Sequence, residues 1–266
     1  MKNSIILTGC LWGCLSVPAM GQFPYGTTGL LQMPTADMNQ DKTFMCGASF
    51  LNTHSTPKWN YNTYNYYINI TLFPWLEIGY DCTLHKGEPG NYWPRSTWGR
   101  FVNQDRQFSV KVLVWKEKRY MPGMVLGGND VLTRDWAWTD KKEDSGFGLP
   151  VNTGNGRWNR YYIAFTKHFP FQNVGKLGVH IAYVYNKRKD YPFNGPAIGA
   201  NFQFQFLSKY FFAKAINSLN LMAEYDSRTT NLGAEYSLWK DYIHAVIEFN
   251  RCQYFSGGLV FKVHLK

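Results

Sequence analysis

The chain has 266 residues and a net charge of +10 at pH 7, from 28 Lys and Arg against 18 Asp and Glu. Aromatic residues make up 18% of it, whereas a typical soluble domain has roughly half to two-thirds of that share. Its mean hydropathy is only −0.35. This combination argues against a helical membrane protein and suits a transmembrane β-barrel, whose strands mix lipid-facing and lumen-facing residues.

The N-terminus is predicted to be a secretory signal peptide over residues 1–21. Lys2 supplies the positive charge, residues 5–17 form a short apolar core, and small residues precede the expected cleavage site. A lipoprotein-type modification of Cys10, in the sequence LTGC, is the alternative. Beyond the apolar core, no run approaches the roughly 20 apolar residues of a membrane helix. We therefore expect an exported protein.

Without Lys2 the exported chain has 27 basic and 18 acidic residues, a net charge of +9. This charge favours anionic surfaces or polymers as partners, and export argues against nucleic acid. Cys46, Cys82 and Cys252 remain after cleavage and lack the spacing of a metal site. We predict no metal and no cofactor, and isolated cysteines, with one disulfide as the alternative.

Residues 22–42 are predicted to form an N-terminal periplasmic segment that precedes the barrel. Its punctuation by glycine and proline is typical of a turn. The segment could plug the barrel or dock a periplasmic partner, or simply pack as a turn and short strand that starts the barrel. The candidate residues for plugging or docking are Gly29, Met33, Pro34 and Thr35.

From residue 43 to residue 266, apolar and polar side chains alternate in about twelve segments of roughly ten residues, the length of a tilted membrane strand. In residues 61–73, for example, Ile68 and Ile70 share one face of the predicted strand, and Asn69 lies on the other. The segments are 44–54, 61–73, 75–85, 108–114, 123–132, 158–168, 177–186, 202–206, 219–225, 232–238, 243–250 and 259–265. Short and long connections alternate through the first two-thirds of the chain. We predict an all-β, single antiparallel up-and-down transmembrane barrel without helices.

A soluble sandwich would also alternate, but the polar face here carries charges on successive strands. Charges inside a barrel require a wet lumen or mutual pairing. The candidate lumen-lining residues are Lys111, Glu224, Asp226, Glu235, Glu248, Lys262 and His264. They could form a path for sugars or set ion preference, or they could be salt bridges that fill a narrow barrel.

Two long loops combine aromatic and basic residues, which can stack on sugar rings and hold acidic substituents. The candidate glycan-contact residues are Tyr92, Trp93, Arg95, Trp98, Arg100, Trp136 and Trp138. Interfacial anchoring and loop packing are the alternative roles. Glu224 and Glu235 superficially resemble the paired acids of a glycosidase, but pairing with cations is favoured. We predict no catalytic residues.

Several motifs, in order, resemble the YjbH-like family of outer-membrane proteins. They are GTTGLLQMPTADM (26–38), LFPWLEIGY (72–80), NQDRQFSVKV (103–112), RYMPGMVLGGND (119–130) and LMAEYDSRTTNLGAEY (221–236). The resemblance implies a non-enzymatic barrel of the bacterial outer membrane that supports exopolysaccharide export or assembly. The predicted partners are outer-membrane lipid, from the barrel pattern, and the barrel-assembly machinery, from the spaced apolar residues of the last strand after Gly258. The charge and the resemblance together add an anionic exopolysaccharide and periplasmic secretion proteins. A barrel hydrolase or acyltransferase and a passive porin are the alternatives.

Overall fold

The computed structural model describes residues 20–22, 24–56, 61–89, 93–132, 158–186, 194–207 and 210–265. Twelve strands of this part form one closed barrel, and two short strands pair separately near the N-terminus. The short strands are β1 (Met20–Gly21) and β2 (Thr28–Gly29). The barrel strands are β3 (Thr43–Leu51), β4 (Thr63–Phe73), β5 (Leu76–Lys86), β6 (Phe101–Trp115), β7 (Gly123–Asn129), β8 (Arg160–Phe171), β9 (Gly175–Tyr185), β10 (Gly195–Phe204), β11 (Leu219–Tyr225), β12 (Thr230–Trp239), β13 (Ile243–Asn250) and β14 (Tyr254–His264).

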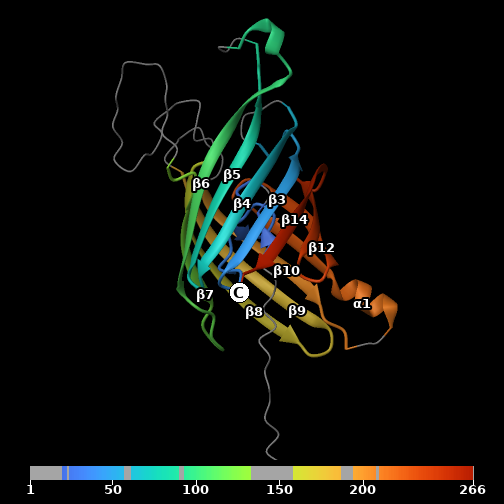
Figure 1. Ribbon diagram of the computed structural model, residues 1–266. Helices are drawn as coiled ribbons and strands as arrows, with labels where there is room; N and C mark the ends of the chain where they lie inside the picture. The colour runs from blue at the N-terminus through green and yellow to red at the C-terminus, as the bar shows by residue number, and fades with distance from the viewer. Residues whose placement is uncertain are drawn as a thin grey trace, which may run out of the picture.

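Each barrel strand pairs antiparallel with its neighbours in sequence, and β14 pairs with β3 to close the ring (Figure 1). That last pairing runs from Gly257 opposite Phe50 to His264 opposite Thr43. Closure gives the backbone groups of both terminal strands a partner, so the ring has no open edge. The predicted all-β antiparallel barrel is confirmed, with twelve strands.

The outer wall of the barrel is apolar, as β9 illustrates. Ile181, Tyr183 and Tyr185 point outward and each expose more than half of their surface. Ala182 and Val184 alternate with them and are buried. Because successive side chains of a strand point to opposite faces, the sequence alternation sorts residues between wall and lumen. An apolar outer wall is the distribution expected of a barrel in lipid.

The two ends of the barrel differ in their connections. We call the end where β3 begins and β14 ends the terminus-side end, and the opposite end the loop-side end. Strands are joined at the terminus-side end by residues 74–75, 116–122, 172–174, 205–218 and 240–242. They are joined at the loop-side end by residues 52–62, 87–100, 130–159, 186–194, 226–229 and 251–253. The β5–β6 hairpin projects furthest beyond the loop-side rim (Figure 1).

The expectation of a chain without helices is wrong in one connection. Helix α1 (Phe211–Asn217) lies between β10 and β11 at the terminus-side end, and a 3-10 turn, η1 (Arg95–Thr97), lies between β5 and β6. Two consecutive aromatic residues, Phe211 and Phe212, interrupt the period of two that a strand requires. Within the described residues, helices are too short and too polar to cross a membrane.

The segment that precedes the barrel lies inside it. Residues 24–36 are all buried, and β2 sits within the ring in Figure 1. Their hydrogen-bond partners come from the inward faces of strands around the ring, including β5, β6, β8, β11 and β13. The lumen is therefore filled by chain rather than open along its length.

Candidate functional site

The N-terminal segment forms a folded plug, defined here as residues 22–38. It reverses direction between Gly29 and Pro34, which pair as an antiparallel bridge. A β-carbon at position 29 would lie only 2.5 Å from Cγ of Gln22, so glycine is required for the close approach. The plug contains all four N-terminal candidate residues: Gly29, Met33, Pro34 and Thr35.

Glu224, on β11, holds the tip of the plug. Its carboxylate accepts hydrogen bonds from the backbone N–H groups of Leu31, Gln32 and Met33 at 3.0, 2.8 and 3.2 Å. The side-chain amide of Asn231 donates a fourth, at 3.0 Å. Successive N–H groups that converge in this way form a concave anion site. One carboxylate thereby orders a three-residue turn.

Lys111 and Glu77, which lie opposite each other on the neighbouring strands β6 and β5, hold the middle of the plug. Lys111 Nζ donates to the Thr28 carbonyl at 2.8 Å and to the Asp37 carbonyl at 2.5 Å. Glu77 accepts from the backbone N–H and the hydroxyl of Thr28, both at 2.6 Å. All of these groups except Asp37 are fully buried. The buried ammonium and carboxylate are thus satisfied through the plug backbone.

Arg160, at the start of β8, holds the loop-side part of the plug. Its guanidinium donates to the Gln32 carbonyl at 2.8 Å and to Oε1 of Gln22 at 3.0 Å. It also lies 3.4 Å from the centre of the Tyr25 ring, a cation–π contact. The sequence analysis missed Arg160 and Glu77. Both occupy lumen-facing positions in the alternating pattern of their strands, and that pattern could have identified them.

Two further lumen candidates have separate roles. Glu248, on β13, accepts a hydrogen bond from the side-chain amide of Gln32 at 2.8 Å, which adds a contact to the plug. Asp226 instead accepts from the backbone N–H groups of Arg228 and Thr229 at 2.9 and 2.7 Å. It therefore caps the β11–β12 turn rather than the plug.

Apolar plug residues pack where the barrel wall has glycine. A β-carbon on Gly199 would lie 2.6 Å from Leu30 Cδ1 and 2.6 Å from Met33 Sδ. One on Gly233 would lie 2.5 Å from Leu31 Cδ2. The wall is thus recessed under these three side chains, and the plug tip is fitted to the lumen by shape as well as by charge.

A second charged cluster lies at the terminus-side end, and its members pair with one another; we call it the mouth cluster. It contains Glu235, Asp241, His244, Lys262 and His264. The His244 imidazole bridges two carboxylates: Nδ1 lies 2.9 Å from Glu235 Oε1 and Nε2 lies 3.2 Å from Asp241 Oδ1. His264 Nε2 lies 3.0 Å from Asp241 Oδ2. Three of the sequence candidates therefore meet here, joined by a histidine and an aspartate.

Asp241, in the β12–β13 turn, is the ion-pair centre of the mouth cluster. Partial burial by itself would raise the pKa of its carboxyl group. The hydrogen bonds from His244 and His264 and the charge of Lys262 outweigh this effect and lower the pKa to about 2. The carboxylate is therefore ionised throughout the physiological pH range.

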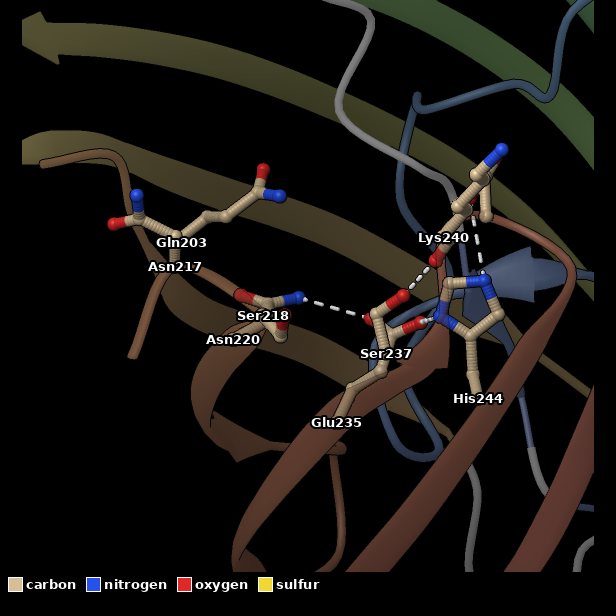
Figure 2. A pocket seen from close by; sticks show the side chains of 9 residues that line it. Gln203, Asn217, Ser218, Asn220, Glu235, Ser237, Lys240 and His244 are labelled. Carbon is tan, nitrogen blue, oxygen red and sulfur yellow. Dashed lines mark hydrogen bonds and ion pairs between the residues drawn. The ribbon is translucent and has the colours of Figure 1, made fainter. Parts of the chain in front are cut away.

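A cavity of about 380 Å³ opens beside the mouth cluster. Its lining residues are Gln203, Asn217, Ser218, Asn220, Glu235, Ser237, Lys240, Asp241 and His244. Figure 2 shows Asn220 and His244 directed toward Glu235 from two sides. The Asn220 side-chain amide donates to Glu235 Oε2 at 3.3 Å. The cavity lies among the ends of β10 to β13, away from the plug contacts of Glu224 and Glu248.

The glycan-contact candidates lie far from both charged regions. Trp93, Arg95, Trp98 and Arg100 occupy the tip of the β5–β6 connection. There the Trp98 indole N–H donates to the Trp93 carbonyl at 3.0 Å, and the Arg95 guanidinium lies 5.6 Å from the centre of the Trp98 ring. Tyr92, Trp136 and Trp138 lie outside the described residues. The structure thus separates loop aromatics from lumen charges.

The two carboxylates considered for glycoside chemistry have different partners. Glu224 faces the plug backbone, whereas Glu235 pairs with His244 and lines the cavity. Within the described part of the chain, His, Cys, Asp and Glu residues do not gather in a group of three or more that could hold a metal ion. Cys46, Cys82 and Cys252 are free thiols.

Comparison with known proteins agrees with the motifs in the first half of the chain. Residues 22–135 match the model of the YjbH family, described as exopolysaccharide biosynthesis protein YbjH. The chain is also 28% identical over 127 residues to the uncharacterized lipoprotein YjbH of Escherichia coli (strain K12). That alignment covers 47% of this chain and only 17% of the E. coli protein. The similarity to the YjbH family is therefore shown for the plug and for β3 to β7.

Proposed function

We propose that this protein is a plugged β-barrel of the bacterial outer membrane that supports exopolysaccharide export or assembly without catalysing a reaction. The observation that carries the proposal is that charged side chains of the lumen bind the plug. Glu224, Glu77, Lys111 and Arg160 all bind the plug rather than line an open channel. The plug also lies within residues 22–135, the region that is similar to the exopolysaccharide biosynthesis family.

The outer wall supports a location in lipid. Outward-facing aromatic and aliphatic side chains recur on the barrel strands, and a lipid environment would cover them. We propose outer-membrane lipid and the barrel-assembly machinery as the first partners. The machinery would act on β14, whose pairing with β3 completes the ring.

The proposed substrate of transport is an extracellular polysaccharide. We propose that the barrel acts on it together with periplasmic secretion proteins. The net charge of +9 expected for the exported chain, 27 basic against 18 acidic residues, favours an anionic polymer near the protein surface. The exposed tip of the β5–β6 hairpin, with Trp98 and Arg95, is a suitable contact for such a polymer on the loop side. Export makes nucleic acid an unsuitable partner.

The plug favours this function over a passive porin. Residues 24–36 are buried and make hydrogen bonds to several strands, so steady diffusion would require that the plug leave. A role in which the barrel opens only during transport, or serves as a platform, does not need a permanent channel. The engagement of Glu224 by three backbone N–H groups likewise favours a structural role for it over acid–base catalysis.

Two measurements test the proposal, one in the natural host and one on the purified protein. Deletion of the protein in the host is expected to lower extracellular polysaccharide. Expression of the wild-type chain should restore the polysaccharide, and the chain should be found in the outer-membrane fraction. Purified wild-type protein in planar bilayers should show no steady conductance. Steady open conductance with unchanged extracellular polysaccharide would instead identify a porin. Turnover of lipid or glycan, lost in Glu235→Gln, would identify an enzyme.

A further inference from the structure

We infer that the cavity at the terminus-side mouth is a binding site for an uncharged sugar unit of the transported polymer. This inference rests on the proposed function for the identity of the polymer, but the site itself is argued from its lining. The cavity measures about 380 Å³, which lies within the range of small-molecule sites, roughly 300–1,000 Å³. It can enclose one or two sugar rings but not a long chain.

The lining offers hydrogen bonds of both kinds. Three amide side chains line the cavity, and that of Asn217 bonds the backbone of Phe206 through both its oxygen and its nitrogen, so Gln203 and Asn220 are the amides left for a ligand. The Ser218 hydroxyl can donate or accept, whereas the Ser237 hydroxyl donates to the Lys240 carbonyl and can still accept. Sugar hydroxyls also donate and accept, so such a lining matches a polyol ring better than it matches an apolar ligand.

Hydrogen-bonding capacity remains unused in the cavity. Oε1 of Gln203 is buried and has no hydrogen-bond partner among the residues that the structure describes. The Asn220 side chain accepts a hydrogen bond from the Asn201 amide at 2.9 Å and donates to Glu235 at 3.3 Å, which leaves its second amide hydrogen for a ligand. A buried acceptor without a partner is unfavourable by roughly 1–3 kcal/mol. A ligand hydroxyl that donates to Gln203 would remove this deficit.

The carboxylates of the cavity disfavour an anion, although Lys240 also lines it. Two carboxylates, Glu235 and Asp241, line it, and they already engage His244. Lys262 Nζ lies 3.9 Å from Asp241 Oδ1, so its charge is also directed toward a carboxylate. An acidic sugar or a phosphate would bring a further negative charge beside two carboxylates. A neutral sugar meets no such repulsion.

The lining also predicts weak binding. None of the lining residues is aromatic, so the site lacks a flat surface on which a sugar ring could stack. Hydrogen bonds that replace bonds to water contribute little net affinity each. We therefore expect millimolar binding and rapid release, which suits a site on a transport path.

Saturation-transfer NMR on the purified full-length protein in detergent micelles tests the inference. The probes are glucose, N-acetylglucosamine, glucuronate and inorganic phosphate. At least one neutral sugar should bind more tightly than glucuronate and phosphate. Gln203→Ala should weaken its binding roughly fivefold, the effect of about one hydrogen bond. Gln203→Ala removes a side chain whose Oε1 has no partner in the described part of the chain, so heat-shifted gel mobility should remain that of a folded barrel.

Gln253→Ala is the matched control, because Gln253 is exposed in the β13–β14 connection at the opposite end of the barrel. It should bind the neutral sugar as the wild type does. The inference fails if no neutral sugar binds, if Gln203→Ala binds as well as the control, or if glucuronate or phosphate binds most tightly. Because binding is measured on purified protein, it is independent of secretion. Selective binding without a secretion defect would refute the proposed function and leave the site standing.

Discussion

The plug contacts and the mouth cluster place similar residues in different surroundings. Glu224 and Glu235 both point inward from adjacent strands, β11 and β12. Glu224 is enclosed by backbone N–H groups of the plug, whereas Glu235 pairs with His244 beside a cavity. The comparison teaches that strand parity determines which side chains enter the lumen, while the chain that fills the lumen determines what they bind.

The largest expected effect comes from removal of the plug. Replacement of residues 24–36 by a Gly-Ser linker of equal length should open the lumen, because these residues fill it and are buried. It also leaves Glu224, Glu77 and Arg160 without their plug partners, and each such buried charge is strongly destabilising. We expect steady single-channel conductance in planar bilayers and a lower melting temperature.

A second replacement, at a turn away from the plug, controls for the introduction of Gly-Ser residues as such. Residues 251–253, the exposed β13–β14 turn, can be exchanged for Gly-Ser residues without contact to the plug. This variant should stay closed and melt as the wild type does. Equal conductance of the two variants would show that the plug is not what closes the barrel.

A smaller effect is expected from single carboxylates in the two regions. Glu224→Ala leaves the N–H groups of Leu31, Gln32 and Met33 without their acceptor, and we expect a loss of roughly 3 kcal/mol in the free energy of unfolding. Asp241→Asn, at the partly exposed mouth, should lose no more than about 1 kcal/mol because water can replace the lost contacts.

Urea unfolding in micelles measures both losses, and hydrogen exchange locates them. Exchange should accelerate at Leu31, Gln32 and Met33 in Glu224→Ala and stay unchanged there in Asp241→Asn. Equal losses in the two variants, with no change in exchange at the plug tip, would contradict the distinction between the regions.

The sequence predicted the wall far better than it predicted the contents of the lumen. Alternation is a local property of each strand, so the inward placement of Lys111, Glu224 and Glu248 could be derived from parity alone. Their partners lie up to 216 residues away, in the case of Gln32 and Glu248. Such a pairing depends on closure of the ring and on the path of the plug, neither of which leaves a periodic signal.

Helix α1 and the cavity show the same limit. The apolar pair Phe211 and Phe212 indicates only that a strand has ended. The cavity combines Gln203, Ser218 and Asp241 from three separate connections or strand ends at the terminus-side end. No local spacing links them, because they are brought together by the order of strands around the ring.

Strong acid should weaken the mouth cluster through Asp241. The pKa of Asp241 is lowered in the folded protein to about 2 from 3.8. Its stabilising contribution is therefore complete above pH 3.8 and is lost as the pH falls through about 2. Since the side chain is 42% exposed, we expect a loss of less than about 1 kcal/mol after solvent screening.

The temperature at which heat-shifted gel mobility changes, measured at pH 6 and at pH 2, reports this loss. The wild-type protein should lose more stability at pH 2 than Asp241→Asn does. Asp41→Asn, which changes an exposed carboxylate just before β3, is the matched control and should behave as the wild type. Indistinguishable acid sensitivity of the three proteins would remove Asp241 as the acid-sensitive group.

The smallest expected effect tests the fit of the plug against the wall. Gly199→Ala adds a methyl group 2.6 Å from the flexible ends of Leu30 and Met33, so the ends of these two side chains must move away from the wall. We expect a loss of less than about 1 kcal/mol, with faster hydrogen exchange confined to residues 30–33. Gly257→Ala adds the same group 2.9 Å from Phe255, a ring that points outward from β14. If the plug is fitted to the recess, only the inward substitution should accelerate exchange at the tip, and equal exchange in the two variants would mean that the plug tip does not depend on that recess.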